Sequence, residues 1–492
     1  MAGEPTTQPL RADVAVVGAG AAGLYAALTA AREGASVVLV SRSALAESAS
    51  YWAQGGIAAA LAPDDSVERH LEDTIKAGRG AGRPSAARVL CEHSPAAVHD
   101  LQALGVHFDA DQTGALELGL EGGHSTRRVV HAGGSATGRR ITRDLSALVA
   151  TDERIEVLER STASALWRSD GACVGVVAER PGGALTPVTA RGTVIATGGL
   201  AALWKRTTNP RGAIGAGLTL AAAAGAELAD LEFMQFHPTA LVHDDPALDG
   251  FLITEAVRGE GALLLDGGGE RFVDELAPRD EVALAVHAVR RAGGEVRLDM
   301  RAVDPAHFPN VTAALHRAGI DPRRDLVPVA PAAHYTMGGI ATGLDGEASL
   351  PGLLAVGECA CNGLHGANRL ASNSLAECFV FGRRAALAAT ALPAPVSDPG
   401  PAPDRGPNPV PPHSTREALW RSAGLVRDPA ELEQLAAEDP FPLARAIARS
   451  ALARAESRGA HQRVDRPATD PDLDGMHSVV RGEADALFRS WD

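Results

Sequence analysis

The fold is decided by Asp13-Val-Ala-Val-Val-Gly18-Ala-Gly20-Ala-Ala-Gly23, near the start of a chain of 492 residues. A short apolar run ends at Gly18, as a buried parallel strand does. Alanine-rich Ala21 to Arg32 follows as a predicted helix that ends near Gly34, and Ser36 to Val40 is the next predicted strand. Strand, helix and strand within about 30 residues are the unit of a doubly wound α/β sheet.

The three glycines of this stretch fit the pattern GxGxxG, placed between a strand and a helix. In that context the glycines allow a tight turn and a close approach to a pyrophosphate at the helix N-terminus. A glycine-rich turn that only packs is the alternative. The second strand ends in Ser41-Arg42, whereas NAD-binding proteins place an acid there for a ribose hydroxyl. The sequence therefore favours FAD over NAD, with Arg42 near a phosphate or the adenosine.

The composition is acidic, with 61 Asp and Glu residues against 46 Lys and Arg residues and a formal net charge of −15. Only Lys76 and Lys205 are lysines, so almost every basic side chain is a guanidinium. This balance argues against binding to nucleic acids or acidic membranes, which require a basic surface. An anionic small molecule is still compatible, because a pocket can be locally cationic.

We expect a cytoplasmic protein without a membrane segment. The five cysteines include no CxxC pair, which is typical of reduced thiols. No signal peptide is visible in Met1 to Asp13. The most apolar long stretch, Ala216 to Ala226, is far shorter than the roughly 20 residues that cross a bilayer.

Two further strand-like runs, Thr193 to Gly199 and Leu353 to Glu358, end in glycine-containing turns. Their separation predicts an α/β fold in which a Rossmann-like FAD-binding domain is interrupted by an α+β capping domain. A Pro-rich linker and a C-terminal helical domain follow. The predicted division is 1–227 and 341–392 for the FAD-binding domain, 228–340 for the capping domain, 393–413 for the linker and 414–492 for the C-terminal domain.

Five more motifs follow along the chain, and their order carries information as well as their residues. They are Ser50-Tyr-Trp-Ala-Gln-Gly-Gly-Ile57, Ala196-Thr-Gly-Gly199, Gly357-Glu358, Gly363-Leu-His-Gly-Ala-Asn-Arg-Leu-Ala-Ser-Asn-Ser-Leu375 and Glu456-Ser-Arg-Gly-Ala-His461. Together they resemble the succinate dehydrogenase/fumarate reductase/L-aspartate oxidase flavoprotein family, from about Asp13 to Phe381 and again in the C-terminal domain.

The resemblance implies an FAD site. Glu358 would accept from the ribose hydroxyls, and the helix start at Ser374-Leu375 would cap the isoalloxazine. A turn at Gly55-Gly56 and a helix cap at Ser374 are the structural alternatives for single residues. The full predicted set of cofactor-binding residues is Gly18, Ala19, Gly20, Ala21, Gly23, Arg42, Ala49, Ser50, Tyr51, Trp52, Ala53, Gln54, Gly55, Gly56, Glu358, Asn373, Ser374 and Leu375.

Two positions depart from the family pattern. Members that attach FAD covalently carry a histidine just before the AQGG stretch, where this chain has Ala49. A methyl group cannot bond the flavin, so non-covalent FAD is expected. Ala216 stands where the family places an acidic residue near the cofactor, so that contact is not expected here.

Cations and hydrogen-bond donors come from several separated segments of this acidic chain: His237, Thr254, Arg258, Arg279, His334 and Arg369. Such a set suits a small dicarboxylate, because arginine offers a planar fork to a carboxylate and histidine adds donors. Structural alternatives exist for each residue. Arg279 could form a surface ion pair with Asp280, and Arg258 could pair with Glu255 or Glu260.

The resemblance assigns roles to these residues. It implies that His237, Thr254, His334 and Arg369 hold the carboxylates of a C4 dicarboxylate against the flavin, with Arg258 nearby. Arg279 matches the family's proton-transferring arginine. Because the pKa of arginine is above roughly 12, this role requires a dry, cationic pocket.

Glu121 is the predicted determinant of substrate choice. Leu120-Glu121-Gly-Gly-His-Ser-Thr-Arg-Arg128 resembles the aspartate oxidase form of a loop in which succinate-specific relatives carry an uncharged amide. A carboxylate there can pair with an α-ammonium group. A solvated loop acid is the alternative.

The resemblance thus implies FAD-dependent oxidation of L-aspartate to iminoaspartate, with O2 (giving H2O2) or fumarate as acceptor, the first step of de novo NAD biosynthesis. Contact with quinolinate synthase is a further hypothesis, and a monomer or homodimer is expected. The alternative enzyme is a soluble fumarate reductase or succinate dehydrogenase flavoprotein subunit. A flavin-binding module without turnover is the non-enzymatic alternative. No metal site is expected, since Cys359 and Cys361 bracket only one residue and no nearby histidine spacing forms a tetrahedral set.

Overall fold

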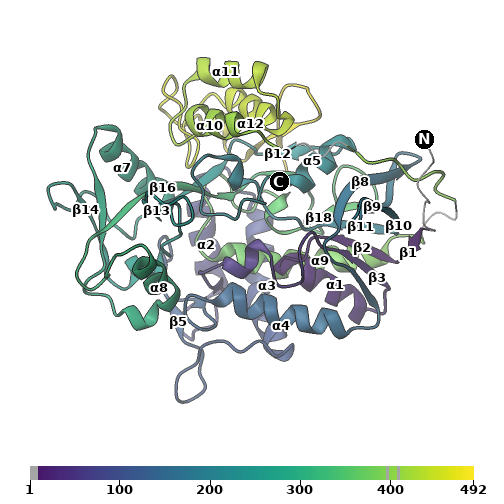
Figure 1. Ribbon diagram of the computed structural model, residues 1–492, viewed down its shortest axis with the longest axis horizontal. Coiled ribbons are helices and arrows are strands. Elements are labelled where there is room, and N and C mark those ends of the chain that lie inside the picture. Colours follow the sequence, from purple (N-terminus) through teal and green to yellow (C-terminus); the bar gives the residue numbers. More distant parts are fainter. Residues whose placement is uncertain (1–8, 395–397, 407–409) are drawn as a thin grey trace.

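The computed structural model describes residues 9–394, 398–406 and 410–492. Its centre is a parallel five-stranded sheet in the order β18-β11-β2-β3-β7 (Figure 1). The predicted strand–helix–strand opening is confirmed as β2, α1 (Ala21–Arg32) and β3. The sheet strands are β18 (Leu353–Ala355), β11 (Gly192–Ile195), β2 (Val14–Val17), β3 (Val37–Val40) and β7 (Ile155–Leu158).

Both faces of this sheet are covered, which explains its continuous apolar strands. Alternate residues of β2 belong to two cores: Val14 and Val16 face the helices, whereas Ala15 and Val17 face a second sheet. The helices on one face are α1, α4 (Thr137–Thr151), α9 (Asn373–Ala391), α3 (Pro84–Ala103) and α2 (Val67–Ala77). The second sheet contains β1 (Leu10–Arg11), β10 (Leu185–Thr189), β9 (Ala172–Glu179) and β8 (Thr162–Ser169).

A second body projects from one side of this core and has an apolar core of its own (Figure 1). Its antiparallel sheet has the order β13-β16-β15-β14. We call it the cap. Its elements are β13 (Met234–Leu241), α6 (Ala256–Gly259), β14 (Leu263–Asp266), α7 (Arg279–Arg291), β15 (Val296–Asp299), α8 (Pro309–Arg317) and β16 (Val327–Thr336).

The C-terminal region begins with the expected helices α10 (His413–Ser422), α11 (Pro429–Glu438) and α12 (Pro442–Ala453). Residues 476–490 then form strands that the sequence did not predict. Strand β20 pairs with β12, more than 200 residues earlier, so no local pattern announces it. This sheet contains β19 (Ala360–Cys361), β17 (Gly339–Ala341), β12 (Leu228–Ala229), β20 (Met476–Val480) and β21 (Leu487–Ser490).

Short elements complete the fold. A small sheet of β4 (Ile57–Ala58), β6 (Val129–Val130) and β5 (Leu118–Gly119) lies beside the cap, and α5 (Ala216–Ala223) follows a glycine turn. The 3-10 helices are η1 (Ala49–Trp52), η2 (Ala201–Leu203), η3 (Pro305–His307), η4 (Gly357–Cys359) and η5 (Pro471–Leu473). Of the predicted linker, residues 395–397 and 407–409 lie outside the described part of the chain. Among the helices described, none has the length and apolar character needed to cross a membrane.

Candidate active site

A cavity of about 440 Å³ opens at the carboxyl ends of the central parallel strands and reaches the cap. Open α/β sheets bind ligands at this edge. The turn after β2, the 47–56 segment, η4 and the start of α9 line one part of it, and residues from the cap line the other.

The glycine turn leaves room for a ligand at the N-terminus of α1. Gly18 has φ +111°, and a Cβ there would lie 2.3 Å from the Ala196 carbonyl oxygen. The N-cap of α1 is Gly20, which offers no side chain, and the Ala21 amide donates to Ser50 Oγ at 3.1 Å. The positive end of the helix therefore faces the cavity with little side-chain cover, as a pyrophosphate requires.

Glu358, which follows β18, and Arg42, which follows β3, have side chains that suit the binding of a nucleotide. Burial raises the pKa of Glu358 to about 7, and its Oε1 accepts from the Thr336 amide at 3.0 Å. Hydroxyl donors would favour the charged form of this carboxylate. The exposed Arg42 lines the cavity and donates to the Gly212 carbonyl at 3.3 Å.

Several buried polar atoms of the lining lack a hydrogen-bond partner among the described residues. They are Ser48 Oγ, Gln54 Oε1, Thr197 Oγ1 and Arg369 Nε. Buried polar groups are nearly always paired, so this set indicates a polar ligand in the cavity. Together with the open helix N-terminus and the glycine cradle, these residues fit FAD.

The cap end of the cavity is cationic. His237 on β13, His334 on β16, Thr254, Arg279 and Arg369 all line it. Gln235 holds the two arginines, because its Oε1 accepts from Arg279 Nη1 at 3.2 Å and from Arg369 Nη2 at 3.1 Å. The Arg369 guanidinium also lies over the Tyr335 ring, 4.4 Å from its centroid.

Both histidines of this cluster are neutral. Burial, reinforced by the charge of Arg279, lowers the pKa of His237 and of His334 well below the usual value. His237 Nδ1 accepts from the Thr239 amide at 3.3 Å, so its proton lies on Nε2. Burial and Arg279 also lower the pKa of Arg369 to about 10. The pocket is thus short of negative charge and ready to bind an anion.

Glu255 supplies the counter-charge behind Arg279. Its carboxylate accepts from Arg279 Nε and from the Gly122 amide, and Arg258 Nη2 lies 3.4 Å from it. Burial alone would raise the pKa of Glu255, but the two arginines hold it below the usual value. From the sequence, Glu255 is expected only as a partner of Arg258. Its spacing before Arg258, which puts both on the same short helix turn, was the available signal.

Glu121 is fully buried behind Gly55 rather than in the lining itself. Ser372 Oγ donates to its Oε2 at 2.7 Å, whereas Oε1 has no hydrogen-bond partner among the described residues. A Cβ on Gly55, which does line the cavity, would lie 3.6 Å from this oxygen. Although burial raises the pKa of Glu121, nearby His131 and Arg279 lower it to about 2, so the group is a carboxylate.

Most predicted site residues line the cavity, and a few do not. Gly23 packs on the Gly18 carbonyl, Tyr51 stacks edge-on against Trp52, and Asn373 hydrogen-bonds to His70 and Thr74. Arg258 points to the Glu275 carbonyl. Four residues of the site were not predicted from the sequence: Gln235, Glu255, Tyr335 and Ser372. Within the described residues, no group of three or more His, Cys, Asp or Glu side chains is arranged to hold a metal ion.

The parallel sheet, the glycine cradle and the cationic pocket define an FAD-dependent oxidoreductase. The family model for the FAD binding domain matches residues 13–375, and that for the fumarate reductase flavoprotein C-terminal region matches residues 423–487. FAD is therefore the cofactor.

The whole-chain comparisons are more specific. The L-aspartate oxidase of Caulobacter vibrioides is 47% identical over 96% of this chain and 98% of its own length. That of Xylella fastidiosa is 44% identical over 92% of this chain and 91% of its own. This chain belongs to the L-aspartate oxidase family. Among solved structures, the E. coli quinol fumarate reductase subunit FrdA superposes with a TM-score of 0.87 at 29% identity, covering 98% of this chain and 96% of that one.

Proposed function

We propose that this protein oxidises L-aspartate to iminoaspartate. The observation that carries the proposal is Glu121, a buried carboxylate beside a cationic pocket, whose Oε1 makes no hydrogen bond to the described residues and lies 3.8 Å from His131 Nε2. A dicarboxylate with an α-ammonium group matches both charges, whereas succinate offers no positive charge to the carboxylate of Glu121.

Several donors line the pocket for the carboxylates of the substrate. Arg369 offers its guanidinium, His237 donates from Nε2, and His334 and Thr254 complete the set. Gln235 fixes the separation of Arg369 and Arg279. Such a preformed set fixes Cα relative to the cofactor, and orientation is a large part of catalysis.

Glu121 would hold the ammonium group through Oε1. Its pKa of about 2 makes it a weak base, so it binds and orients the nitrogen, which releases its proton towards solvent. FAD, when bound, would take up two electrons and a proton from the substrate and would pass them to fumarate or, with a second proton from solvent, to O2, giving H2O2. With fumarate, Arg279 would supply the second proton, and the neighbouring positive charge of Arg369 supports that role because it favours proton release.

A soluble fumarate reductase is the second candidate, since the pocket accepts a dicarboxylate. Anaerobic mixing of the FAD-loaded protein with L-aspartate, D-aspartate, succinate and L-glutamate separates the two. We expect L-aspartate to bleach the flavin and, with air admitted, to consume oxygen and release peroxide. Bleaching by succinate but not by L-aspartate would reject the proposal.

We propose that FAD is held without a covalent bond, because the cavity wall offers the methyl group of Ala49 at the position where covalent members of the family carry histidine. Acid precipitation should release the yellow colour to the supernatant. Colour that stays with the pellet would contradict this.

The remaining proposals concern the setting of the enzyme. All five cysteines are free thiols, which supports a reducing, cytoplasmic compartment. Iminoaspartate would pass to quinolinate synthase. The separate apolar core of the cap, with buried members from Leu241 to Val329, supports a capping domain within residues 228–340.

A further inference from the structure

Arg279 is the first residue of α7, and the next two residues of this helix contact the FAD-binding part of the chain. Arg79 donates from Nε to Asp280 Oδ2 at 2.8 Å and from Nη2 to Asp280 Oδ1 at 3.0 Å. Its Nη2 also contacts Glu281 Oε1 at 2.5 Å. The side chain of Asp280 is only 6% exposed, so this forked contact is shielded far better than a surface ion pair.

The backbone of Arg79 has an unusual conformation and is hydrogen-bonded to a residue of the C-terminal region. Arg79 has φ +54°, a left-handed conformation that a non-glycine residue adopts at a cost of about 1 kcal/mol or more. Its carbonyl oxygen accepts from Arg458 Nη1 at 2.7 Å. A Cβ on the next residue, Gly80, would lie 2.7 Å from the same nitrogen, so glycine there leaves room for this contact.

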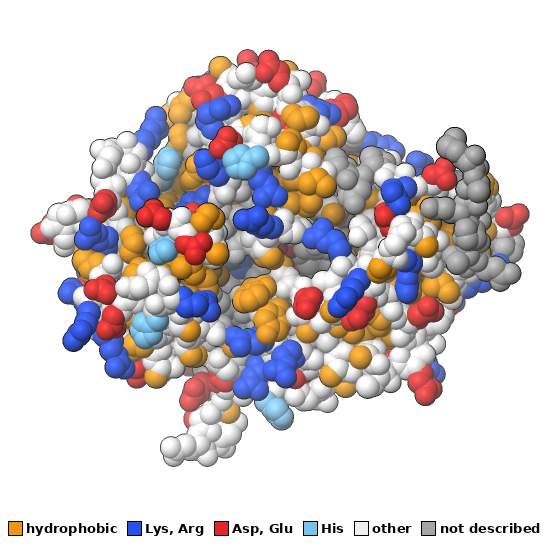
Figure 2. Space-filling model, viewed as in Figure 1, with side chains coloured by type: hydrophobic (Ala, Val, Ile, Leu, Met, Phe, Trp, Pro, Cys, Tyr) orange, Lys and Arg blue, Asp and Glu red, His pale blue; other side chains and the backbone are white. Residues whose placement is uncertain are grey.

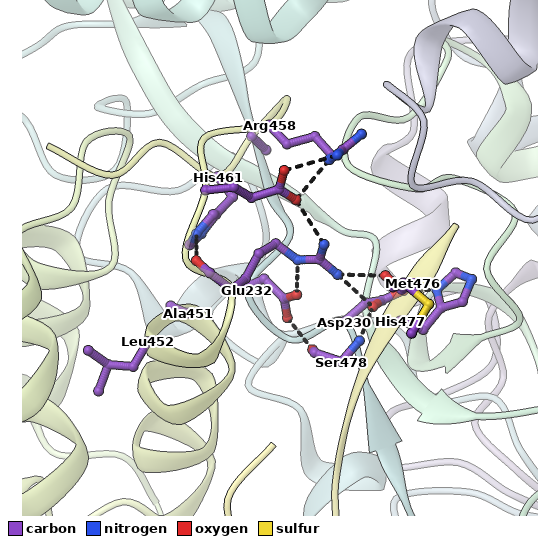
Figure 3. Close-up of polar contacts among 12 residues, drawn as sticks. Asp230, Glu232, Ala451, Leu452, Arg458, His461, Met476, His477 and Ser478 are labelled. Atoms are coloured by element: carbon purple, nitrogen blue, oxygen red, sulfur yellow. Dashed lines mark hydrogen bonds and ion pairs between the residues drawn. The ribbon is translucent and has the colours of Figure 1, made fainter. Parts of the chain in front are cut away.

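Arg458 belongs to the C-terminal region and is itself fixed. It forks onto Glu456 with distances of 2.8 and 2.9 Å, and Glu456 also accepts from Arg454, which pairs with Glu232 (Figure 3). All four side chains are buried. Arg79 therefore lies where three regions meet: its helix end, the first turn of α7 and the C-terminal ion network.

Because Asp280 and Arg279 are neighbours on the first turn of α7, the contact of Asp280 with Arg79 also fixes the position of Arg279. Successive residues point about 100° apart around the axis. Asp280 faces Arg79 while Arg279 faces the cavity, so anchoring one sets the rotation and height of the other. A displacement of about 1 Å in a group that acts on substrate can cost about 100-fold in rate.

We propose that Arg79 is a positioning residue for Arg279. By holding Asp280, it fixes the first turn of α7, and the C-terminal region sets Arg79 through Arg458. This inference rests on the proposed function only in that Arg279 serves as the proton donor to fumarate.

The cap has other attachments, so removal of Arg79 leaves it in place. Asn310 on α8 accepts from Arg139 at 2.7 Å and donates to the Ser135 carbonyl at 3.2 Å. Gln54 donates to the Leu252 carbonyl at 3.0 Å. Loss of the Arg79 contact should therefore loosen the start of α7 without releasing the cap.

The test uses FAD-loaded protein reduced with dithionite, freed of excess reductant and mixed anaerobically with fumarate or, separately, with O2. The variants are Arg79→Met, Asp280→Asn, the two combined, and Arg79→Lys. We expect the return of flavin colour with fumarate to slow about 10- to 100-fold in Arg79→Met and in Asp280→Asn. The fumarate concentration that gives the half-maximal rate should change little. The rate with O2, which does not need Arg279, should be unchanged. The double variant should be no slower than the singles, and Arg79→Lys should be intermediate.

The matched control is Arg301→Met, which breaks a similar forked pair with Asp299 (2.9 and 2.8 Å) within the cap but outside α7. It should leave both rates unchanged. Hydrogen–deuterium exchange should be faster in the first turn of α7 of the Arg79→Met protein and unchanged in α8.

Unchanged fumarate rates, equal slowing with O2, loss of FAD, or additive losses in the double variant would each overturn the inference. Failure of L-aspartate to reduce the wild-type flavin would reject the proposed function and leave this test intact, because dithionite supplies the electrons. Should fumarate not reoxidise the wild type, exchange at α7 decides alone, and unchanged exchange there overturns the inference.

Discussion

We propose that Glu121 is the residue whose charge separates an amino-acid substrate from a plain dicarboxylate. The substitution Glu121→Gln keeps the shape and the acceptor for Ser372 but removes the charge. Breaking a buried charge pair typically costs 2–5 kcal/mol, so kcat/KM for L-aspartate should fall about 30-fold or more. Reoxidation of the reduced protein by fumarate, which has no ammonium group, should change by less than about 3-fold. Stopped-flow traces of flavin absorbance give both values.

Glu117→Gln is the control for this prediction, because Glu117 is an exposed acid on the same segment. It should leave L-aspartate oxidation unchanged. Unaltered L-aspartate kinetics in Glu121→Gln would mean that Glu121 does not contact the substrate.

The residues that the sequence predicted for substrate binding are those with a distinctive functional group and motif. His237, His334 and Arg369 were found on that basis, and all line the cavity. Gln235 and Glu255 were not, although they fix Arg279. Their role comes from the contacts of their side chains across the fold, with partners 44 and 24 residues away, and local spacing does not encode such contacts.

The two ends of α1 give a prediction at the scale of an element. Gly18 before the helix has φ +111° and a site for Cβ that overlaps the Ala196 carbonyl, whereas Gly34 after it has φ +87° and open space around it. Gly18→Ala should therefore move the turn that approaches the pyrophosphate, at a cost of at least about 1–3 kcal/mol. We expect weakened FAD binding, measured as flavin retained on desalting. Gly34→Ala, strained but unobstructed, should retain FAD, and equal retention by both variants would contradict the assignment of the turn.

The sheet that contains β12 and β20 is where sequence reasoning fell short, and the cause is an interaction far apart in sequence. Strand β20 is joined to the loop after β12 by Arg454, which donates to Glu232 Oε1 at 2.7 Å and to the Met476 carbonyl at 2.7 Å. Figure 3 shows Glu232, Ser478 and Asp230 around this guanidinium. The arginine-rich composition of the C-terminal region could not reveal that these side chains would be buried together.

Arg454→Met should lower the stability of the protein sharply, because it leaves Glu232 and Glu456 buried without their shared cation. Breaking such a buried pair costs about 3–5 kcal/mol. Thermal unfolding followed by circular dichroism should show a lowered Tm. Arg466→Met is the control, since Arg466 is exposed and 3.9 Å from Asp465. An equal Tm for the two variants would show that the buried network adds nothing to stability.

At the scale of the whole molecule, the net charge of −15 conceals a sharp local difference. Acidic and basic side chains are mixed over the face drawn in Figure 2, so no single-sign field dominates it. In the pocket, by contrast, Arg279 and Arg369 converge with two neutral histidines. The surplus of acid favours solubility, while burial concentrates the guanidinium charge where a dicarboxylate binds.

Burial also sets how the stability of the molecule depends on pH. Burial is the main cause of a lowered pKa for several histidines; for His70 it brings the value to about 3. A histidine whose folded pKa lies below its unfolded value of about 6.5 takes up its proton first in the unfolded chain. Such a histidine therefore leaves the free energy of unfolding unchanged above pH 6.5 and lowers it below pH 6.5. The others in this group are His124, His237, His334 and His461.

Between pH 6.5 and 5 the carboxylates with lowered pKa, such as Glu121 at about 2, stay ionised. Glu358, whose pKa burial raises to about 7, stabilises the folded state as the pH falls, by at most about 1.4 kcal/mol per pH unit, but the buried histidines outnumber it and set the sign in this window. Each buried neutral histidine should remove at most about 1.4 kcal/mol per pH unit from the free energy of unfolding. Urea unfolding of the FAD-loaded protein at pH 7.5, 6.5 and 5.5 should thus show little change over the first step and a loss of several kcal/mol over the second. His70→Gln, which can still donate to Asn373, should reduce the slope by about one proton. Equal unfolding free energies at pH 6.5 and 5.5 would mean that these imidazoles become protonated in the folded protein without cost. The assignment of His237 and His334 as neutral hydrogen-bond donors would then be wrong.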